Sequence, residues 1–445
     1  MKKTNQQCSP DRISNLPESI RNDIVSFLPM VDAIRTSILS KSWRNVCSSL
    51  SNLDFDQQLF EEMSGKKTSF KESVNQLIGC RDGSSINSFK LVVDVNDSTV
   101  PHIHAWISYV VQHNVQKLHL CCKLNYGSLA SLPCSLFACR TLTVLSLTAI
   151  HLELPAVVQF PLLKLLDLQL INWSDDEQTN RLISSCPLIE RLSLVSCSWN
   201  KLSILVISAP NLKSLVLQPI PPPEEVRISC PNLYEIQYTG PPPDISAETL
   251  SSLLCADLNL VPSWDKLNRL SETNIPRVTK IFMGMQNVVH LMLARFSLEL
   301  LSGNLDLLSK STTSSCSTKK LDLTVFSAKR QVQFVASLLI IFPNLQALTI
   351  RFRDEGPFIL VLGEYCQPQK SSDLGALEII IIENLKGSDN ELYLVQHFLE
   401  NAKILSKLEI AYSIELHEDE PRRISIREKI FQFVKASSVA TISFM

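Results

Sequence analysis

The sequence predicts an α/β fold made of a short N-terminal helical segment, an irregular solenoid of parallel strands with right-handed crossovers, and a C-terminal segment that closes the solenoid. Two observations support this fold class. Residues 16–29 read LPESIRNDIVSFLP, a one-faced apolar helix between two prolines. From about residue 89 a short L-x-L pattern recurs, mostly at intervals of 21–30 residues, and such a period is typical of stacked-repeat proteins.

Residues 9–50 predict three short helices. Pro17 fits the first helical position, where its missing N–H has no partner to lose, and Pro29 ends the first helix. Ser40 is expected to cap the third helix. This pattern alone leaves two interpretations, a helical cap on the first repeat or an element that docks onto another protein. The apolar residues of these helices are Ile20, Ile24, Phe27, Leu28, Ala33, Ile34, Ile38, Trp43, Val46 and Cys47.

Residues 51–88 are polar and mixed, and they are interpreted as a connector. In the strands that follow, the leucines of L-x-L should point into the core and the middle residue outward, because alternate strand residues face opposite sides. One strand cannot bury its leucines alone, so the units stack in parallel and are joined by right-handed crossovers. The strands are expected at residues 91–95, 117–120, 144–147, 165–168, 191–194, 214–217, 235–238, 290–293, 320–323, 347–350 and 407–410.

An outer crossover helix is predicted in the stretch that ends at Pro187. Ser174 and Glu177 have the spacing of a capping box at its start. Leu182 and Ile183 should form its inner face. Because proline disfavours helix in the residue before it, it separates outer segments from the next strand. The same punctuation recurs at residues 160–163, 209–212, 230–233 and 342–345.

These units resemble leucine-rich repeats, in which an asparagine or cysteine usually stands three residues after the last strand leucine. Only Cys197 fits that pattern here. The turns are therefore expected to pack through apolar side chains, and the solenoid to be irregular. The proline tracts at 221–223 and 241–243 are interpreted as extended linkers on one rim. The residues at the turn position are Ile150, Ile171, Cys197, Ile220, Phe296 and Phe326.

The N-terminal pattern DRISxLPxxI…SFLPxxxAIRTSxLSxxWR resembles the F-box of plant proteins over about 40 residues. Arg21 departs from the F-box pattern, which usually has an apolar residue there, and its stem is expected along a rim with the charge in water. The resemblance implies docking onto a Skp-type adaptor and, through it, a cullin. The residues expected to bury on docking, some of them within the F-box's own core, are Leu16, Pro17, Ile20, Ile24, Leu28, Pro29, Leu39 and Trp43.

Residues 377–412 are similar to the FBD domain that often follows F-box and leucine-rich segments in plants. The pattern predicts a strand, a loop, a helix and a second strand. Leu392, Val395, Phe398 and Leu399 should line one helix face. The segment is interpreted as a further repeat that closes the open end of the solenoid. The predicted domains are an F-box at 9–50, a connector at 51–88, a leucine-rich-repeat solenoid at 89–365 and an FBD domain at 370–445.

Composition and motifs argue against several functions. The net charge of -2 gives no basic excess for nucleic acid, and no apolar run approaches a membrane span. The thirteen cysteines include no CxxC pair, which favours a reducing compartment, the cytoplasm or the nucleus. Glycine is only 11 of 445 residues, so phosphate-binding loops are not expected. His102 and His104 could be two metal ligands on one strand, but no further ligand lies at metal spacing.

The predicted function is that of a substrate-recognition adaptor of a Skp–cullin–F-box ubiquitin ligase. No catalytic residues, cofactor or metal are expected. One alternative is a leucine-rich-repeat scaffold that is not coupled to ubiquitination, and another is an enzyme with an unrecognised site. The substrate is an unidentified protein. The outward strand positions proposed to contact it are His119, Ser146, Asp167, Ser193, Val216, Gln237, Asp322 and Thr349.

Overall fold

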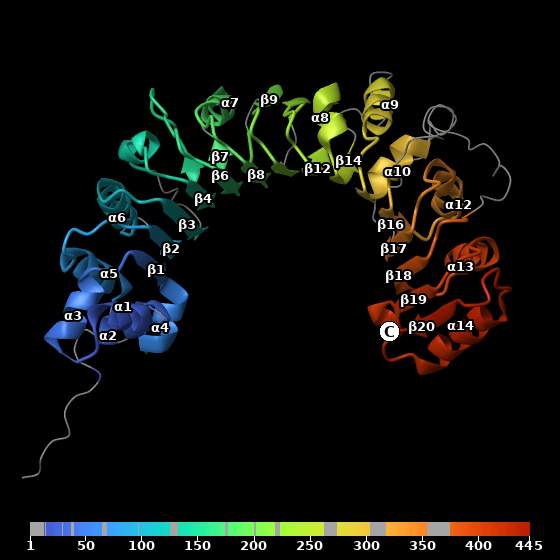
Figure 1. The fold of residues 1–445 in the computed structure, drawn as a ribbon, viewed down its shortest axis with the longest axis horizontal. Coiled ribbons are helices and arrows are strands. Elements are labelled where there is room, and N and C mark those ends of the chain that lie inside the picture. The colour runs from blue at the N-terminus through green and yellow to red at the C-terminus, as the bar shows by residue number, and fades with distance from the viewer. Residues whose placement is uncertain are drawn as a thin grey trace, which may run out of the picture. The chain divides into compact units, whose positions relative to one another are not determined.

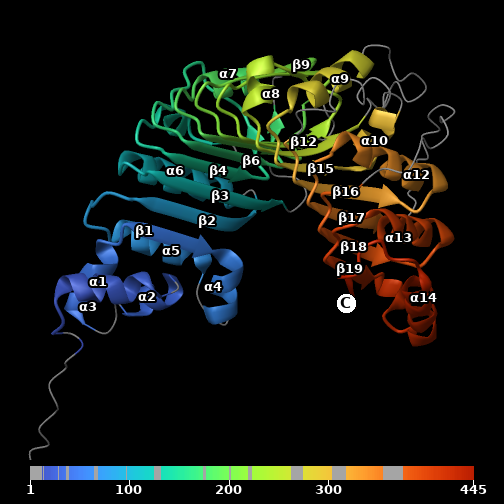
Figure 2. The same cartoon turned by 45° about the vertical axis from the view of Figure 1, so that its right-hand side comes forward.

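The protein is described from a computed structural model, in which the chain divides into two compact units, Met1–Asn200 and Lys201–Met445. Figures 1 and 2 show both units from two sides. The described residues are 13, 15–28, 30–36, 40–64, 69–96, 98–124, 132–173, 177–199, 202–218, 223–261, 274–302, 317–353 and 374–445.

Three short helices open the first unit, as predicted. They are α1 (Glu18–Ser26), α2 (Met30–Thr36) and α3 (Lys41–Ser48). Pro17 is the N-cap of α1, with extended backbone at ψ 148°, so the helix begins one residue later than expected. The buried apolar residues of the three helices are Val25, Ala33, Trp43, Val46 and Cys47.

A parallel sheet follows, and each strand pairs in register with the next in the order β1, β2, β3, β4, β6, β8. Buried and partly exposed residues alternate along β2, β4, β6 and β8, which confirms the inward leucines of L-x-L. The strands are β1 (Asn52–Asp56), β2 (Ser88–Val95), β3 (Lys117–Leu124), β4 (Val144–Thr148), β6 (Leu165–Gln169) and β8 (Arg191–Val195).

The interpretation of residues 51–88 as a connector does not match the structure. This segment holds β1, α4 (Gln57–Ser64) and α5 (Phe70–Gly79), and β1 pairs with β2 over its whole length. Leu53 and Phe55 are buried in the same alternation as later strand leucines. The polar residues around this short L-x-F pattern hid it, so the sheet begins at Asn52 and not at residue 91, where the repeat pattern placed the first strand.

The outer layer of the first unit is mixed. It contains α6 (Val100–Gln112), the 3-10 helix η1 (Cys134–Ala138), α7 (Glu177–Ser184) and a two-stranded sheet of β5 (His151–Leu152) and β7 (Asn172–Trp173). Figure 1 shows α6 and α7 on the same side of the strands. Leu182 and Ile183 are buried on α7 as predicted, while Ser174 lies outside the described residues. His102 and His104 lie on α6, not on a strand.

Left-handed turns follow three successive strands of the first unit. Ala149, Leu170 and Ser196 have φ angles of 58°, 53° and 52°. The Ala149 N–H donates to the Gln169 carbonyl at 2.9 Å, and the Leu170 N–H donates to the Val195 carbonyl at 2.9 Å. The residues that follow these turns are all buried, which confirms apolar packing at three of the six predicted turn positions: Ile150, Ile171 and Cys197. Of the other three, Ile220 lies outside the described residues, and Phe296 and Phe326 are half-buried.

The proline punctuation forms a recurring turn before the next strand. In each case the N–H three residues after the turn's first residue donates back to that residue's carbonyl, as in a β-turn. Proline at the second position fixes φ at the value that this turn needs. The donor and acceptor pairs are Leu163 to Phe160, Ile189 to Cys186, Leu212 to Ala209, Leu233 to Cys230 and Leu345 to Phe342.

The second unit has a parallel sheet of its own, which runs from β10 to β20. Its strands pair in register, with one irregularity between Ile382 and Leu385. The strands are β10 (Ser214–Gln218), β12 (Glu235–Gly240), β14 (Cys255–Leu260), β15 (His290–Leu293), β16 (Lys320–Phe326), β17 (Ala347–Arg353), β18 (Ile379–Leu385), β19 (Lys407–Tyr412) and β20 (Thr441–Phe444).

Strand β14 was not predicted. It reads CADLNL, and its first inward residue is Ala256 rather than leucine. The small side chain concealed the repeat between Tyr238 and Leu293, where the predicted pattern had a gap. The structure fills that gap, because β14 pairs with β12 on one side and β15 on the other.

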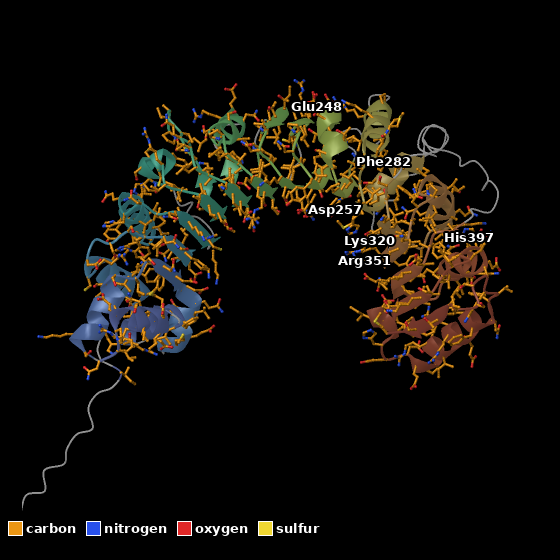
Figure 3. All side chains as sticks on the ribbon, in the orientation of Figure 1. Glu248, Asp257, Phe282, Lys320, Arg351 and His397 are labelled. Carbon is orange, nitrogen blue, oxygen red and sulfur yellow. The ribbon has the colours of Figure 1, made fainter. Side chains whose placement is uncertain are left out.

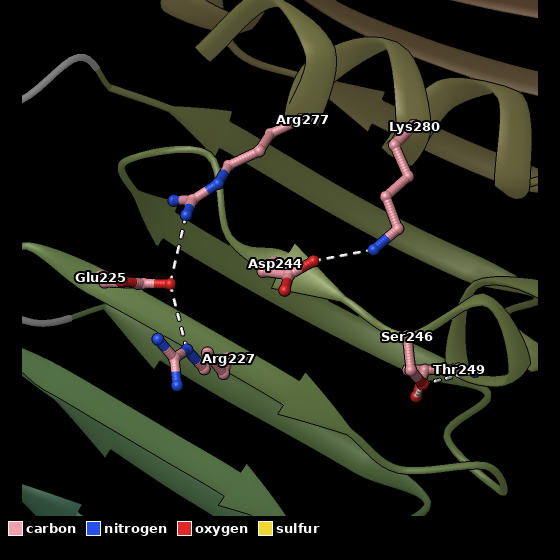
Figure 4. Close-up of polar contacts among 7 residues, drawn as sticks. All are labelled: Glu225, Arg227, Asp244, Ser246, Thr249, Arg277 and Lys280. Atoms are coloured by element: carbon pink, nitrogen blue, oxygen red, sulfur yellow. Dashed lines mark hydrogen bonds and ion pairs between the residues drawn. The ribbon is translucent and has the colours of Figure 1, made fainter. Parts of the chain in front are cut away.

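An outer three-stranded parallel sheet covers part of the second unit. It consists of β9 (Ile204–Ser208), β11 (Glu225–Ser229) and β13 (Asp244–Ile245). Figure 4 shows two ion pairs that join it to a helix, Arg277 to Glu225 at 3.1 Å and Lys280 to Asp244 at 2.7 Å. The helices of this layer are α8 (Ala247–Ser252), α9 (Asn274–Gly284), α10 (Arg295–Ser302), α12 (Lys329–Leu338) and the 3-10 helix η3 (Leu339–Ile341).

The proline tract at 241–243 is buried, not an extended linker on the rim. The fully buried Tyr238 hydroxyl donates to the Pro241 carbonyl at 2.5 Å, which ties the tract to the end of β12. Burial also raises the pKa of this hydroxyl far above its usual value. In the tract at 221–223 only Pro223 is described, and it is buried.

The predicted strand, loop, helix and strand of the C-terminal segment are confirmed by β18, α13 (Asp389–Asn401) and β19. Ser388 and Glu391 form a capping box at the start of α13. The 3-10 helix η4 (Ile414–Leu416), α14 (Glu420–Gln432) and β20 follow. The buried residues on α13 include the four predicted ones, Leu392, Val395, Phe398 and Leu399.

Candidate protein-docking surfaces

Helix α1 carries apolar side chains on its outer face. Ile20 is 44% exposed, Ile24 is 37% exposed and Phe27 is 86% exposed. On the same helix Val25 is buried at 2%. A helix whose outer face is apolar while its inner face already has a core is a candidate for contact with another protein. We call Ile20, Ile24 and Phe27 the α1 outer face.

The structure separates the predicted F-box residues into two sets. Trp43 is 3% exposed, so it belongs to the core of the three helices rather than to an outer surface. Pro17 is exposed, and Leu16 and Leu28 are half-buried. Pro29 and Leu39 lie outside the described residues. Phe27 was part of the predicted apolar stripe but not of the predicted docking set, and its spacing from Ile20 was the available signal.

Arg21 is half-buried on α1, so its side chain is less exposed than the sequence suggested. Its Nε and Nη1 atoms are shielded from solvent and have no hydrogen-bond partner among the described residues. An unpaired buried guanidinium is costly. The departure from the F-box pattern therefore places a half-buried arginine on α1, next in sequence to Ile20 of the outer face.

The predicted substrate residues of the first unit lie in one row across the sheet. Residues of the L-x-L middle position pair as Cα partners from strand to strand. The four predicted residues of this unit are half-buried, so their side chains are partly available at the surface. We call this row the first inner row, and it runs Asp54, Lys90, His119, Ser146, Asp167 and Ser193; of these, Asp54 and Lys90 are exposed rather than half-buried.

The first inner row is polar and internally bonded. The Lys90 ammonium lies 3.1 Å from Asp54 Oδ2, and the Ser146 hydroxyl donates to Asp167 Oδ2 at 3.2 Å. Burial, reinforced by Lys90, lowers the pKa of His119, so this imidazole is neutral at pH 7. The row thus offers hydrogen-bonding groups and charges that already have partners.

The second unit has an equivalent row, the second inner row. Val216 and Gln237 are Cα partners, as are Asp322 and Thr349. Asp257 and Met292 also belong to it but were missed, because β14 was not recognised and Met292 was not selected. Figure 3 shows Asp257 on the strand side and Glu248 and Phe282 on the helix side. In order, this row is Val216, Gln237, Asp257, Met292, Asp322, Thr349, Ile381 and Glu409.

Acids of the second inner row differ in their partners. His290 Nε2 lies 2.9 Å from Asp322 Oδ2, and the Lys320 ammonium is 3.7 Å from the same atom. Asp257 is instead hydrogen-bonded by Gln237, and burial raises its pKa. Arg351 adds a further cation beside this row (Figure 3), and its Nε lies 2.5 Å from Glu383 Oε2.

The described residues contain no group of three or more metal-ligating side chains. None of the ten described cysteines is in a disulfide, and burial raises the pKa of Cys122, Cys186 and Cys197 to about 12. Such thiols stay protonated and are poor nucleophiles. Of the two adjacent cysteines at the end of β3, Cys122 is buried in the core and Cys121 is half-buried. No described helix is long and apolar enough to cross a membrane.

Models of three protein families match different parts of the chain. The F-box domain model matches residues 13–55. The model described as "FBD-associated F-box protein At5g56370, LRR repeats" matches residues 103–246. The FBD model matches residues 374–410. These matches fall on the three helices with β1, on the repeats of both units, and on the segment from β18 to β19.

Similar proteins of Arabidopsis thaliana align over most of the chain. F-box/LRR-repeat protein 13 is 27% identical over 89% of this chain and 89% of its own length. F-box/LRR-repeat protein At3g58930 is 27% identical over 98% and 97%. F-box/FBD/LRR-repeat protein At1g78750 is 26% identical over 92% of each chain. With an F-box, leucine-rich repeats and an FBD segment in that order, the chain belongs to the F-box/FBD/LRR-repeat protein family.

Proposed function

We propose that this protein is the substrate-recognition adaptor of a Skp–cullin–F-box ubiquitin ligase. The F-box docks onto a Skp-type adaptor and, through it, a cullin. The inner rows bind a target protein. The chain itself performs no bond chemistry and needs no cofactor.

The α1 outer face is the observation that carries this proposal. Ile20, Ile24 and Phe27 are exposed although the three helices already have a core around Val25 and Trp43. Apolar side chains left outside a formed core gain most from burial against a partner, at about 25 cal/mol per Å² of apolar surface. An F-box whose only role was to cover the first repeat would turn this face inward.

The inner rows support the second half of the proposal. They present partly exposed side chains of mixed size and polarity, one from each strand. Protein interfaces have this mixed composition. Because each row rests on a buried sheet, binding requires little ordering of the backbone, which lowers the entropic cost of association.

The proposed contribution to ubiquitin transfer is proximity. Holding a target's lysines near a charged ubiquitin carrier makes a bimolecular step effectively intramolecular. Bivalent holding through two surfaces raises the effective concentration of the target without any new contact at the reacting atoms. Free thiols in the described part of the chain fit the proposed cytoplasmic or nuclear setting.

Co-purification with the Skp-type adaptor tests the docking half. The triple variant Ile20→Ala, Ile24→Ala, Phe27→Ala should lose the adaptor, and Leu16→Ala with Pro17→Ala should do the same. Ile414→Ala is the matched control, because Ile414 is 82% exposed in the second unit. Unchanged adaptor binding by the triple variant would overturn the docking claim. It would leave the leucine-rich-repeat scaffold not coupled to ubiquitination as the better reading.

Affinity purification of the full chain with a cullin inhibitor present tests the substrate half. Target proteins should accumulate on the wild type. Substitutions along the second inner row, such as Gln237→Ala with Asp257→Ala, should remove them while adaptor binding persists. Targets that stay bound to this variant would show that recognition lies elsewhere.

A further inference from the structure

The last strand of the second unit, β20, has one open edge. Among the described strands it pairs with β19 alone, at the end of the sheet, and Figure 1 shows it beside α14. It lies beyond the FBD match, which ends at residue 410. An edge strand of this kind presents a row of backbone N–H and C=O groups with which another strand can pair.

Two residues of β20 present these backbone groups. The N–H groups of Thr441 and Met445 donate to carbonyls of β19 and of the residue before it, at 3.0 and 2.9 Å. Successive residues of a strand point their backbone groups to opposite edges. The N–H and C=O groups of Ile442 and Phe444 therefore point to the open edge, and we call these two residues the β20 edge.

Strand β20 lacks two of the devices by which edge strands avoid pairing. Its sequence, TISF, holds no proline and no charged residue, and its register with β19 shows no bulge. It is short, however, and one hydrogen bond contributes only about 1 kcal/mol net. Side-chain contacts must therefore add to backbone pairing if the edge is to hold a partner.

Aromatic side chains lie on the face of β20 that meets α14. The half-buried Phe444 ring stacks on Tyr412 with centroids 5.7 Å apart, and its centroid is 5.8 Å from that of Phe431. The Phe431 side chain is still 47% exposed. An added strand would place every second side chain beside Ile442 and Phe444 on this face. Further exposed apolar residues of this part of the chain are Val434, Val439 and Met445.

Two exposed cations lie over these rings. The Arg427 Cζ is 5.3 Å from the centroid of Phe444 and 5.6 Å from that of Phe431, and the Lys435 Nζ is 5.8 Å from the centroid of Phe431. Neither cation has an ion pair in the part of the chain that the structure describes. Contacts with rings contribute only about 0.5–1 kcal/mol at exposed sites. Both charges thus stay available to an acid of a partner.

The charge of the surrounding stretch has the same sign. Residues 420–445 contain five lysines and arginines against two glutamates. One of these, Glu428, follows Arg427 and so points about 100° away around the helix. On the opposite face of the sheet, Glu409 is paired with Lys407 at 2.5 Å. A second copy of the chain would bring two cationic stretches together at this edge, whereas an acidic segment would be attracted to it.

We propose that the open edge of β20 binds an extended segment of a partner protein as an added strand. The segment has apolar side chains at alternate positions, which pack beside Ile442 and Phe444, and acidic side chains at its ends, which reach Arg427 and Lys435. Backbone pairing supplies affinity, and the side chains supply specificity. The β20 edge shares no residue with the α1 outer face or the inner rows, so the proposal does not rest on the ubiquitin-ligase role.

Three capped, fluorescent peptides test this mode of binding in the full chain. The probe DEVTVTVDE has the alternation and the acidic ends, KKVTVTVKK reverses the charge, and DEVTPTVDE has a proline that removes one N–H and one apolar side chain. In fluorescence anisotropy, the second and third peptides should bind at least about tenfold more weakly than the first. Equal binding of the proline peptide would overturn strand addition, and equal binding of the basic peptide would overturn the acidic preference.

Hydrogen exchange locates the added strand. With DEVTVTVDE at about ten times its dissociation constant, exchange of the Ile442 and Phe444 amides should slow about tenfold, because the bound strand accepts or covers these N–H groups. The amides of β1, in the first unit, should exchange as before. Unchanged exchange at Ile442 and Phe444, while the peptide is bound, would show that it binds elsewhere and would refute the proposal.

A proline on the strand itself tests the edge from the protein side. Ile442→Pro removes an N–H that points away from β19, so the pairing with β19 is kept. Ile442→Ala is the matched control, since it loses the same side chain but keeps the N–H. The proline variant should bind DEVTVTVDE at least about tenfold more weakly than the alanine variant. Equal binding by the two variants would contradict strand addition, and exchange in the wild type decides the question if the proline variant does not fold.

The two cations are tested by Arg427→Gln with Lys435→Gln, which should weaken DEVTVTVDE about tenfold. Lys319→Gln with Lys329→Gln removes two exposed cations elsewhere in the second unit and should leave binding unchanged. Equal effects of the two pairs would refute a specific role for Arg427.

Sedimentation of the full chain without peptide tests the competing occupant. The chain should be monomeric at the concentrations used for peptide binding. A dimer that Ile442→Pro abolishes would show that a second copy takes the β20 edge, and it would overturn the proposal of an acidic partner segment.

Discussion

Glu391 is a fully buried carboxylate that holds the start of α13 in place. Its Oε2 accepts the N–H groups of Lys386, Gly387 and Ser388 at 2.9, 2.7 and 3.1 Å. Its Oε1 accepts the Ser327 hydroxyl, which lies just after β16. One side chain thus joins the loop before α13 to a neighbouring repeat, and removing it should open that loop.

The magnitude follows from the hydrogen bonds. Glu391→Ala leaves three backbone N–H groups without their acceptor, each worth about 1–3 kcal/mol when buried, so a total loss of about 3–9 kcal/mol is expected. Glu391→Gln keeps an oxygen that can face the three N–H groups, and its amide can donate to the Ser327 hydroxyl. Only the charge is lost, which predicts about 1–2 kcal/mol.

Hydrogen exchange in the full chain measures this loss of stability at the loop before α13 itself. A local measurement is needed because unfolding of a chain of two units need not be two-state. In Glu391→Ala, protection of the Lys386, Gly387 and Ser388 amides should fall by at least about 100-fold, against about tenfold in Glu391→Gln. Glu400→Ala, on the exposed face of the same helix, should leave it unchanged. Equal losses in the alanine and glutamine variants would refute the reasoning.

Two further predictions concern single positions. Gly387→Ala should lower the free energy of unfolding by more than about 2 kcal/mol, because the φ of Gly387 is 76° and an added Cβ would clash with Ile426 Cδ1. Gly83 is the control, because its φ is 85° but the space around it is open. In thermal unfolding, Gly83→Ala should cost only about 1 kcal/mol. Asp257→Asn should raise the free energy of unfolding in urea at pH 7 but not at pH 3. Burial raises the pKa of Asp257 in the folded state, so the ionised carboxylate opposes folding above that pKa, and this penalty vanishes once the folded and unfolded states are both protonated. Equal effects at the two pH values would contradict this prediction.

The repeats that were predicted from sequence share one property, a large apolar side chain at both inward positions, which is leucine or isoleucine except at Val93 and Tyr238. Where an inward residue is Ala256, or where Leu53 and Phe55 stand among acids, the pattern weakens although the backbone pairing is the same. Parallel pairing depends on neighbours on both sides, so a weak strand is specified by strong neighbours. That information is not local in the sequence.

For the docking surfaces, the sequence predicted the apolar stripe but not which of its residues would be exposed. The spacing of Ile20, Ile24 and Phe27 gave the apolar stripe, but only packing decides which side of a helix meets the core. Trp43 fits the F-box pattern as well as Ile20 does, and it is buried. The outer sheet of β9, β11 and β13 was not predicted, because its alternation resembles that of the inner strands and the proline tracts before β11 and β13 were interpreted as linkers.

The in-register pairing along each inner row has a consequence for engineering. Each strand contributes one middle side chain to the row, and the residues on either side of it are core. A row can therefore be transplanted as a list of single substitutions, one per strand, without altering the packing beneath. Exchanging these positions between this chain and a relative of similar length would move binding preference as a unit, whereas inserting one residue into any strand would turn its leucines outward.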